Sequence, residues 1–272
     1  MSLSGQKKLP HVGEIASRHD PDRFLMSMIC PPERRTALWS LTAFNYEIAK
    51  TREVVSETTI GLIRLQWWRD MIESIYEGQA VQDHLILQGV QAAVQDYGLD
   101  QADFETLIHG REFDLEDVLP ASIGGLRNYA SFTTAPLNRM MLKILAQDEE
   151  DIVIEQVSQN YAMTGLLRSL ALHAAQQRCY LPEELVQRED VNIHSIYAGK
   201  SLESLEPVVR VIANDVEVSM DKLSPQSRFM KMNHVMSRIY LKQIKSLKYD
   251  MFDQRIAMRP PLFLPLFLWG IR

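Results

Sequence analysis

The sequence predicts an all-α protein, and three observations support this prediction. Apolar residues recur at intervals of three and four along almost the whole chain, which places them on one face of successive helices. Runs that alternate apolar with polar residues and are rich in Val, Ile and Thr, as strands are, are scarce. The breaks between helical stretches are short and lack the composition of a domain linker. We therefore expect one all-helical domain over residues 1–272.

The first long helix is expected over residues 31–57. Pro31 and Pro32 followed by Glu33 make a favourable first turn, because proline fits the first helical position and a carboxylate is stabilised near a helix N-terminus. Apolar side chains then fall near one face, at Leu38, Leu41, Phe44, Ile48 and Val55. A second helix is expected over residues 58–78, where a glycine provides the C-terminal cap.

The rest of the chain continues in the same way. Further helices are expected over residues 81–97, 100–117, 125–145, 151–175, 182–188, 205–223 and 225–252. The stretches "VLPASIGG" and "YAGKSLESLEP" are interpreted as loops between helices.

The last residues, 259–272, are expected to form an apolar, proline-rich C-terminal arm. "RPPLFLPLFLWGIR" carries no charge between Arg259 and Arg272, and its three prolines argue against a regular helix through it. The arm is too short to cross a bilayer, which takes roughly 20 apolar residues. We expect it to pack over the helical core, and the alternative is a strip that docks a partner or a membrane surface.

Charge, cysteines and the N-terminal stretch limit the functional classes. A net charge of −6 does not supply the basic surface of a general nucleic-acid binder. Cys30 and Cys179 have neither disulfide-framework nor zinc-ligand spacing, which fits a reducing compartment. "MSLSGQKKLPHVGEIA" resembles neither a secretory signal nor a transit peptide, and we expect no transmembrane helix. The expected location is the cytoplasm or membrane periphery of a bacterium, or the mitochondrial matrix side in a eukaryote.

Four stretches resemble the squalene/phytoene synthase family in their order and spacing. They are "HDPDRFLMSMICPPERRTALWSLTAFNYEIA", "RLQWWRDMIESIYEG", "LIHGREFDLED" and "LLRSLALHAAQQRCYLPEEL". The resemblance covers about residues 19–185 and continues weakly through "RIYLKQIK". It implies an isoprenoid-synthase-like bundle around a deep apolar cavity, and the enzymes of this family join two prenyl diphosphates head to head.

The chemistry of those enzymes implies a magnesium site. A diphosphate group departs only if its charge is neutralised, and Mg²⁺ held by oxygen ligands performs this task. In the family, a DDxxD-like motif on one helix and an RDxxED-like motif on another hold the metals. Carboxylates four residues apart suit this role because they share one helical face.

The first motif is degenerate in this sequence. Where the family has AFCR, two residues and DDxxD, this chain has "AFNYEIAKTRE". Ala49 and Lys50 replace the first two acids, and only Glu53 keeps a carboxylate at a ligand position. Lys50 and Arg52 bring positive charge to the place of a cation, which is repulsive. Tyr46 stands where the family has arginine.

The second motif is degenerate as well. Counting back from "RCYLP" places the family's RDxxED on residues 168–173. Arg168 is kept, whereas Ser169, Leu172 and His173 replace the acids. Imidazole is a poor ligand for Mg²⁺. We therefore expect no catalytic residue, metal or cofactor, and Mg²⁺ would be needed only if the chain is an enzyme after all.

The family includes a branch without these metal sites, which this sequence resembles more closely than it resembles the synthases. The members of that branch are assembly factors for respiratory complex I, the NADH:quinone oxidoreductase, and "RLQWWRD" with the apolar "PPLFLPLFLW" end is similar to it. The resemblance implies a non-catalytic binding or assembly factor, peripheral at the membrane, with a protein of complex I assembly as partner.

Two alternative functions stay open. A divergent prenyl-diphosphate transferase would use Glu53, His173 and the arginines, and acids such as Asp22 or Glu47 would have to converge with Glu53 around a metal-sized gap. An isoprenoid- or lipid-binding protein would instead keep a wide apolar tunnel between its helices.

A residual ligand pocket is predicted from the resemblance. Its candidate residues are His19, Tyr46, Arg168, Arg178 and Tyr240. Such a basic pocket could bind an anionic lipid or a phosphate without a metal. For each of these residues taken alone, a structural hydrogen bond or ion pair is the simpler interpretation.

Two further features have structural interpretations. "GREFDLEDVLP" gathers Asp114, Glu116 and Asp117, which we interpret as the solvated end of a helix, and we interpret "NDVEVSMDKL" as a charged outer face. Adjacent helical residues point about 100° apart, so one of Trp67 and Trp68 is expected in the core and the other at an interface.

Overall fold

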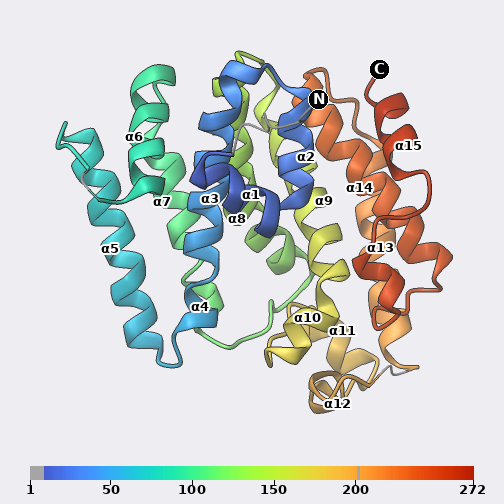
Figure 1. Cartoon of the computed structure of the whole chain (residues 1–272). Coiled ribbons are helices and arrows are strands. Elements are labelled where there is room, and N and C mark those ends of the chain that lie inside the picture. The colour runs from blue at the N-terminus through green and yellow to red at the C-terminus, as the bar shows by residue number, and fades with distance from the viewer. Residues whose placement is uncertain (1–8, 82, 201–202) are drawn as a thin grey trace, which may run out of the picture. The chain divides into compact units, whose positions relative to one another are not determined.

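The all-α prediction is confirmed by a computed structural model, which describes residues 9–81, 83–200 and 203–272 (Figure 1). Within these ranges every regular element is an α-helix or a short 3₁₀ helix. The chain divides into two compact units: residues up to 112 with 139–147 form unit 1, and residues 113–138 with 148–272 form unit 2. The expectation of a single domain stays a prediction.

Unit 1 contains the N-terminal helices. They are α1 (His11–His19), α2 (Pro21–Ile29), a 3₁₀ turn (Pro32–Arg34), α3 (Arg35–Ala49), α4 (Thr51–Val54), α5 (Thr58–Tyr76), α6 (Leu85–Tyr97) and α7 (Gln101–Gly110). The long helix predicted over residues 31–57 is wrong in its continuity, because the chain turns at Lys50 between α3 and α4. The helix predicted over 100–117 ends at Gly110.

Helix α3 is the centre of unit 1 and packs against α1, α2 and α6. The predicted apolar face is largely confirmed, since Leu38, Leu41, Phe44 and Ile48 are all buried. The Phe44 ring meets the Trp68 ring edge-on at 5.4 Å. Trp68 is fully buried while Trp67 is 41% exposed, so the prediction of one core tryptophan is confirmed.

The contact between α3 and α6 requires a glycine. A Cβ atom added to Gly89 on α6 would lie 2.3 Å from the Ser40 hydroxyl and 3.0 Å from its Cβ. The Ser40 hydroxyl is held in place because it donates a hydrogen bond to the Thr36 carbonyl at 2.8 Å. The two helices therefore approach as closely as they do only because residue 89 has no side chain.

Unit 2 contains the remaining helices, with α8 contributing residues to both units. They are a 3₁₀ turn (Phe113–Leu115), α8 (Ile123–Leu145), α9 (Asp151–Arg168), α10 (Leu170–Ala175), α11 (Glu183–Arg188), α12 (Ile193–Tyr197), α13 (Leu205–Asp221), α14 (Arg228–Ser246), a second 3₁₀ turn (Gln254–Ala257) and α15 (Phe263–Gly270). The helix predicted over 151–175 is interrupted at Ser169. The loop predicted at 197–207 includes residues 201 and 202, which lie outside the described ranges.

The core of unit 2 lies between α9, α13 and α14, which pack against one another. Helix α13 buries Val208, Val209, Ile212 and Val216, and α9 buries Met163 and Leu167. Helix α14 is capped at its N-terminus by Ser227, whose side chain accepts a hydrogen bond from the Met230 amide.

The C-terminal arm is partly helical, which corrects the expectation drawn from its prolines. Helix α15 starts after Pro260 and Pro261, where Leu262 takes a left-handed conformation with φ of 60°. Pro265 lies in the first helical turn, where no backbone N–H has a partner within the helix, so its missing N–H costs nothing. Among the described helices, none has the length and apolar character needed to cross a membrane.

We predict that Gly89→Ala destabilises the protein by about 1–2 kcal/mol, because overpacking against Ser40 outweighs the gain in helix propensity. The matched control is Gly165→Ala on α9, where an added Cβ meets nothing within 4 Å; it should be stabilising by roughly 0.5–1 kcal/mol. Urea unfolding of both variants gives the comparison. Equal effects of the two substitutions would contradict a close approach at Gly89.

Candidate functional site

In unit 1, the helix that matches the family's first metal motif carries an ion-pair cluster. The Glu47 carboxylate accepts from Lys50 Nζ at 2.5 Å and from Arg64 at 3.1 Å. The Glu47 side chain is mostly buried, so these interactions are only weakly screened by water. Glu47, which would have to help Glu53 to hold a metal, is thus already neutralised by two cations of the chain.

The ring of Tyr46 extends this cluster towards α1. His19 stacks on Tyr46 with ring centroids 3.9 Å apart, and Lys50 Nζ lies 5.1 Å from the Tyr46 ring centre. Burial, with the positive charges of Arg18 and Lys50 nearby, lowers the pKa of His19 below its ordinary value. The aromatic pair and the lysine therefore fill the space beside the degenerate motif with cationic and neutral groups.

The remaining residues of the first motif do not replace the missing metal ligands. Ala49 ends α3 without a polar side chain, and Glu53 lies exposed on α4. Across the described ranges, no group of three or more His, Cys, Asp or Glu side chains is arranged to hold a metal ion. The residues present at this motif thus do not fit the Mg²⁺ that the family resemblance implies, and we derive no chemical step through it.

In unit 2, the arginine retained from the second motif is engaged by the protein. The Arg168 guanidinium lies over the Tyr240 ring, 3.4 Å from its centre, and Nε is 3.4 Å from the Ile256 carbonyl. Its stacking on Tyr240 links the end of α9 to α14. Ser169 forms the break that follows, and Leu172 points outward and is exposed.

His173, at the last acid position of the second motif, is a neutral, largely buried side chain. Its ring meets the Tyr180 ring edge-on at 4.9 Å. Burial and the charge of Arg178 lower the pKa of His173 to about 4, so the imidazole is uncharged at neutral pH. The adjoining cavity, lined mainly by leucines and Tyr180, has a volume of about 10 Å³. That space is about the size of one water molecule.

Asp114 corrects the prediction of a solvated acidic cluster. Its side chain is only 7% exposed, and the carboxylate accepts hydrogen bonds from the Tyr129 hydroxyl at 2.7 Å and the Tyr180 hydroxyl at 2.8 Å. Burial and the Asp114 charge raise the pKa of Tyr180, so its hydroxyl keeps its proton and donates. Arg178 Nη1 lies 3.4 Å from the same hydroxyl. This network ties the 113–115 turn to α8 and to the segment after α10.

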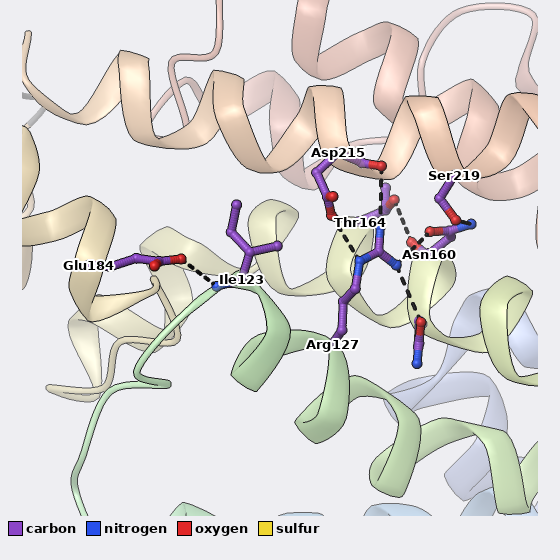
Figure 2. Close-up of polar contacts among 8 residues, drawn as sticks. Ile123, Arg127, Asn160, Thr164, Glu184, Asp215 and Ser219 are labelled. Carbon is purple, nitrogen blue, oxygen red and sulfur yellow. Dashed lines mark hydrogen bonds and ion pairs between the residues drawn. The ribbon is translucent and has the colours of Figure 1, made fainter.

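A second network that the sequence analysis missed is centred on Arg127 of α8 (Figure 2). Its guanidinium donates to the Asp215 carboxylate, with an Nη2–Oδ2 distance of 2.6 Å, and to the Asp215 carbonyl at 3.2 Å. Asn160 on α9 donates to Ser219 on α13 at 3.0 Å. The acids of α13 are thus more than a charged outer face, because Asp215 joins α13 to α8 and Glu217 pairs with Lys245 of α14.

The five predicted pocket residues fall into small sets within the two units. His19 stacks on Tyr46 in unit 1, while Arg168 stacks on Tyr240 and Arg178 faces Tyr180 in unit 2. Each thus makes a contact within its unit, although the contacts of His19, Tyr46 and Tyr240 are ring stacking and not the hydrogen bond or ion pair of the simpler interpretation. That the five line one ligand pocket stays a prediction.

The all-α fold and the order of the two altered metal motifs together indicate the family to which the chain belongs. Residues 16–261 match the squalene/phytoene synthase family model, so the chain belongs to this family. A solved dehydrosqualene synthase in complex with a ligand superposes with a TM-score of 0.79 at 13% identity, covering 96% of this chain and 94% of that one. The predicted isoprenoid-synthase-like fold is confirmed by this likeness.

The relatives of this chain include proteins with two kinds of name. The human NADH dehydrogenase (ubiquinone) complex I assembly factor 6 is 26% identical over 265 residues, which cover 94% of this chain and 79% of the relative. A presqualene diphosphate synthase of Sinorhizobium fredii is 25% identical over 181 residues, covering 63% of each protein. The chain is therefore similar to the assembly factor over a longer stretch than to this synthase.

The lowered pKa of His173 predicts a pH dependence of stability. Above pH 6.5 the imidazole is neutral in both states, and between 6.5 and about 4 the unfolded chain binds a proton that the folded chain does not. The folded state should therefore lose about 2–3 kcal/mol from this group as pH falls through that window, and nothing further below it.

His173→Gln removes the titrating group and should remove this loss. The measurement is urea unfolding of both proteins at several pH values, where the difference between them at pH 7.5 accounts for the change in packing. A wild-type minus variant difference that stays constant from pH 7.5 to 4 would show that the His173 imidazole is not held neutral.

Proposed function

We propose that this chain is a non-catalytic member of the squalene/phytoene synthase family that acts as a binding factor in the assembly of respiratory complex I. The observation that carries the proposal is the pairing of Glu47 with Lys50 and Arg64. Lys50 stands at an acid position of the first motif, and Arg64 reaches Glu47 from α5, so both cations repel a further cation at this place.

The second motif supports the same proposal. A neutral imidazole and a leucine cannot replace two carboxylates as ligands for a hard cation, since Mg²⁺ prefers charged oxygen ligands. The His173 ring, moreover, packs edge-on against Tyr180, and burial lowers its pKa so that it is uncharged at neutral pH. The chain thus keeps the fold and lacks the groups that would neutralise a departing diphosphate, and no cofactor is needed for the function proposed.

The relatives supply the biological role. Proteins of human and of Bos taurus, each named as a complex I assembly factor, are 26% identical to this chain over 94% of its length. A related protein of Dictyostelium discoideum carries the name as a homolog and covers 96% of this chain. We infer that this chain binds a protein intermediate of complex I assembly, at the membrane where the complex is built.

The test is deletion and complementation in the organism that encodes the chain. Deletion should reduce the amount of assembled NADH:quinone oxidoreductase, measured by native gel electrophoresis and by NADH oxidation in isolated membranes. The wild-type gene should restore both. Glu53→Gln, which removes the last carboxylate of the first motif, should restore them equally well, because the proposed function uses no metal.

The matched control is Glu57→Gln, which removes a nearby exposed acid outside the motif. Normal complex I in the deletion strain would contradict the assembly role. Failure of Glu53→Gln at normal protein levels, with Glu57→Gln still active, would indicate that the remaining carboxylate performs chemistry and would favour a divergent prenyl-diphosphate transferase.

A further inference from the structure

The C-terminal part of the chain has a charge opposite to that of the rest. Residues 225–272 contain nine Lys or Arg and two Asp, a net charge of +7. Because the whole chain carries −6, the preceding residues carry −13. The positive charge is thus concentrated on α14, on the segment that follows it and at Arg272, whereas α15 itself is uncharged. Helices α14 and α15 both belong to unit 2 and pack side by side (Figure 1).

Helix α15 is apolar on both its inner and its outer face. Phe263, Phe267 and Ile271 recur every four residues and are buried, and Phe263 stacks on Tyr240 of α14 at 5.4 Å. Its close docking depends on Gly270, where an added Cβ would lie 2.7 Å from Val235 of α14. The outward side chains are nonetheless also large and apolar: Leu262, Leu264, Leu266, Leu268 and Trp269.

These outward side chains are far more exposed than core residues. Leu262 is 71% exposed and Trp269 is 75% exposed. A helix that is apolar all round is normally buried, so an uncovered face of this kind indicates a surface that meets an apolar environment. Met258, in the preceding segment, is exposed in the same way.

A groove between α14 and the C-terminal arm combines this apolar surface with positive charge. It has a volume of about 970 Å³, and its apolar lining includes Val235, Ile239 and Leu266. Its charged lining is basic: Arg238, Lys242, Arg255 and Arg259. Arg238 is paired with Asp221 and Arg255 with Asp253, whereas the groove lining itself contains no acidic residue.

The other flank of α15 is basic as well. A second cleft, of about 580 Å³, is lined by Arg228, Lys231 and Arg272 together with Leu268 and Ile271. The exposed leucines and Trp269 therefore lie between two rows of basic side chains. We name this combination the C-terminal surface: the outward side chains of α15 with the basic residues of both flanks.

We propose that the C-terminal surface binds an anionic phospholipid bilayer, with α15 lying in the headgroup region and the flanking Lys and Arg side chains contacting lipid phosphates. Tryptophan and leucine on one face with basic residues beside them is the composition of helices that lie in a membrane interface. At eight residues α15 is about 12 Å long, too short to span a bilayer.

Charge decides between a bilayer and a second copy of this chain. A symmetric dimer through the C-terminal surface would bring two patches of the same positive sign together, which is repulsive. An anionic membrane offers negative charge and apolar depth at once, and each basic residue near such a surface contributes favourably. This inference deepens the membrane location given in the proposed function, since it names the surface and the class of lipid. It can fail or hold independently of the assembly role, because binding to vesicles needs no protein partner.

The experiment is flotation of the full-length protein with vesicles of phosphatidylcholine alone and with vesicles in which part of the phosphatidylcholine is replaced by phosphatidylglycerol. The protein should float with the anionic vesicles and much less with the neutral ones. Raising the salt concentration should weaken the binding, since salt screens the charges. Tryptophan fluorescence should shift to shorter wavelength on binding, because Trp269 leaves water.

Variants locate the binding surface. Trp269→Ser should weaken partitioning by about tenfold and remove the fluorescence shift. Lys242→Gln should weaken it about fivefold. The matched controls are Ile63→Ser, an exposed apolar residue of unit 1, and Lys222→Gln, an exposed lysine outside the C-terminal surface; neither should change binding. All four side chains are exposed, so the folded state should be retained, which thermal unfolding checks.

Three outcomes would overturn the proposal. The first is equal binding, or no binding, with neutral and anionic vesicles. The second is loss of binding in the control variants to the same extent as in Trp269→Ser. The third is a concentration-dependent dimer in sedimentation that Trp269→Ser abolishes without any vesicle binding, which would assign the C-terminal surface to a second copy of the chain.

Discussion

A carboxylate that is partly removed from water must be paired with a cation or hydrogen-bonded, and in this protein the chain supplies these partners itself. Glu47 receives Lys50 and Arg64, Asp215 receives Arg127, and Asp114 receives two tyrosine hydroxyls. Losing a partner would be most costly at Asp114, which is only 7% exposed, and less costly at the more exposed Asp215. These pairs also join elements: Glu47 links α3 to α5, and Asp215 links α13 to α8.

The same constraint decides what the scaffold can do. A synthase of this family leaves its helix carboxylates to magnesium, and the metal charge then balances the diphosphate. Here Lys50 stands at an acid position and is bound to Glu47, so positive charge is built into the polypeptide. In unit 2, Arg168 stacks on Tyr240 and the neutral His173 packs against Tyr180, so residues of the second motif also make packing contacts. Residues of both altered motifs thus make contacts within the fold.

Much of the fold could be predicted from the sequence. Apolar periodicity located α5, α8, α9, α13 and α14 because each buries one face along several turns. It could not locate the breaks at Lys50 and Ser169, since neither position carries a proline or a glycine and tertiary contacts decide where the helix turns. Helix α15 was missed because the position of Pro265 within the first turn depends on where the helix starts.

The candidate site was predictable only in part. The sequence shows directly that the acids of both motifs are replaced. It does not show which contacts the remaining residues make. Asp114 looked solvated because its tyrosine partners lie 15 and 66 residues away in the sequence. The cavity beside His173 is lined by nearby residues such as Leu170 and Tyr180 and also by Leu126 of α8 and Ile212 of α13, which lie far away in the sequence. Contacts between residues far apart in the sequence thus help to determine the burial and hydrogen bonding of motif residues, which a short motif alone does not reveal.

The most direct test of the central claim is titration calorimetry of the purified protein with farnesyl diphosphate, with and without Mg²⁺, followed by product analysis of the same mixtures. The account predicts that Mg²⁺ changes neither the heat of binding nor the affinity, and that no diphosphate is released, because Glu47 is already paired and His173 is neutral. Metal-dependent binding accompanied by release of diphosphate would contradict it and would show that Glu53 has ligand partners that complete a working site.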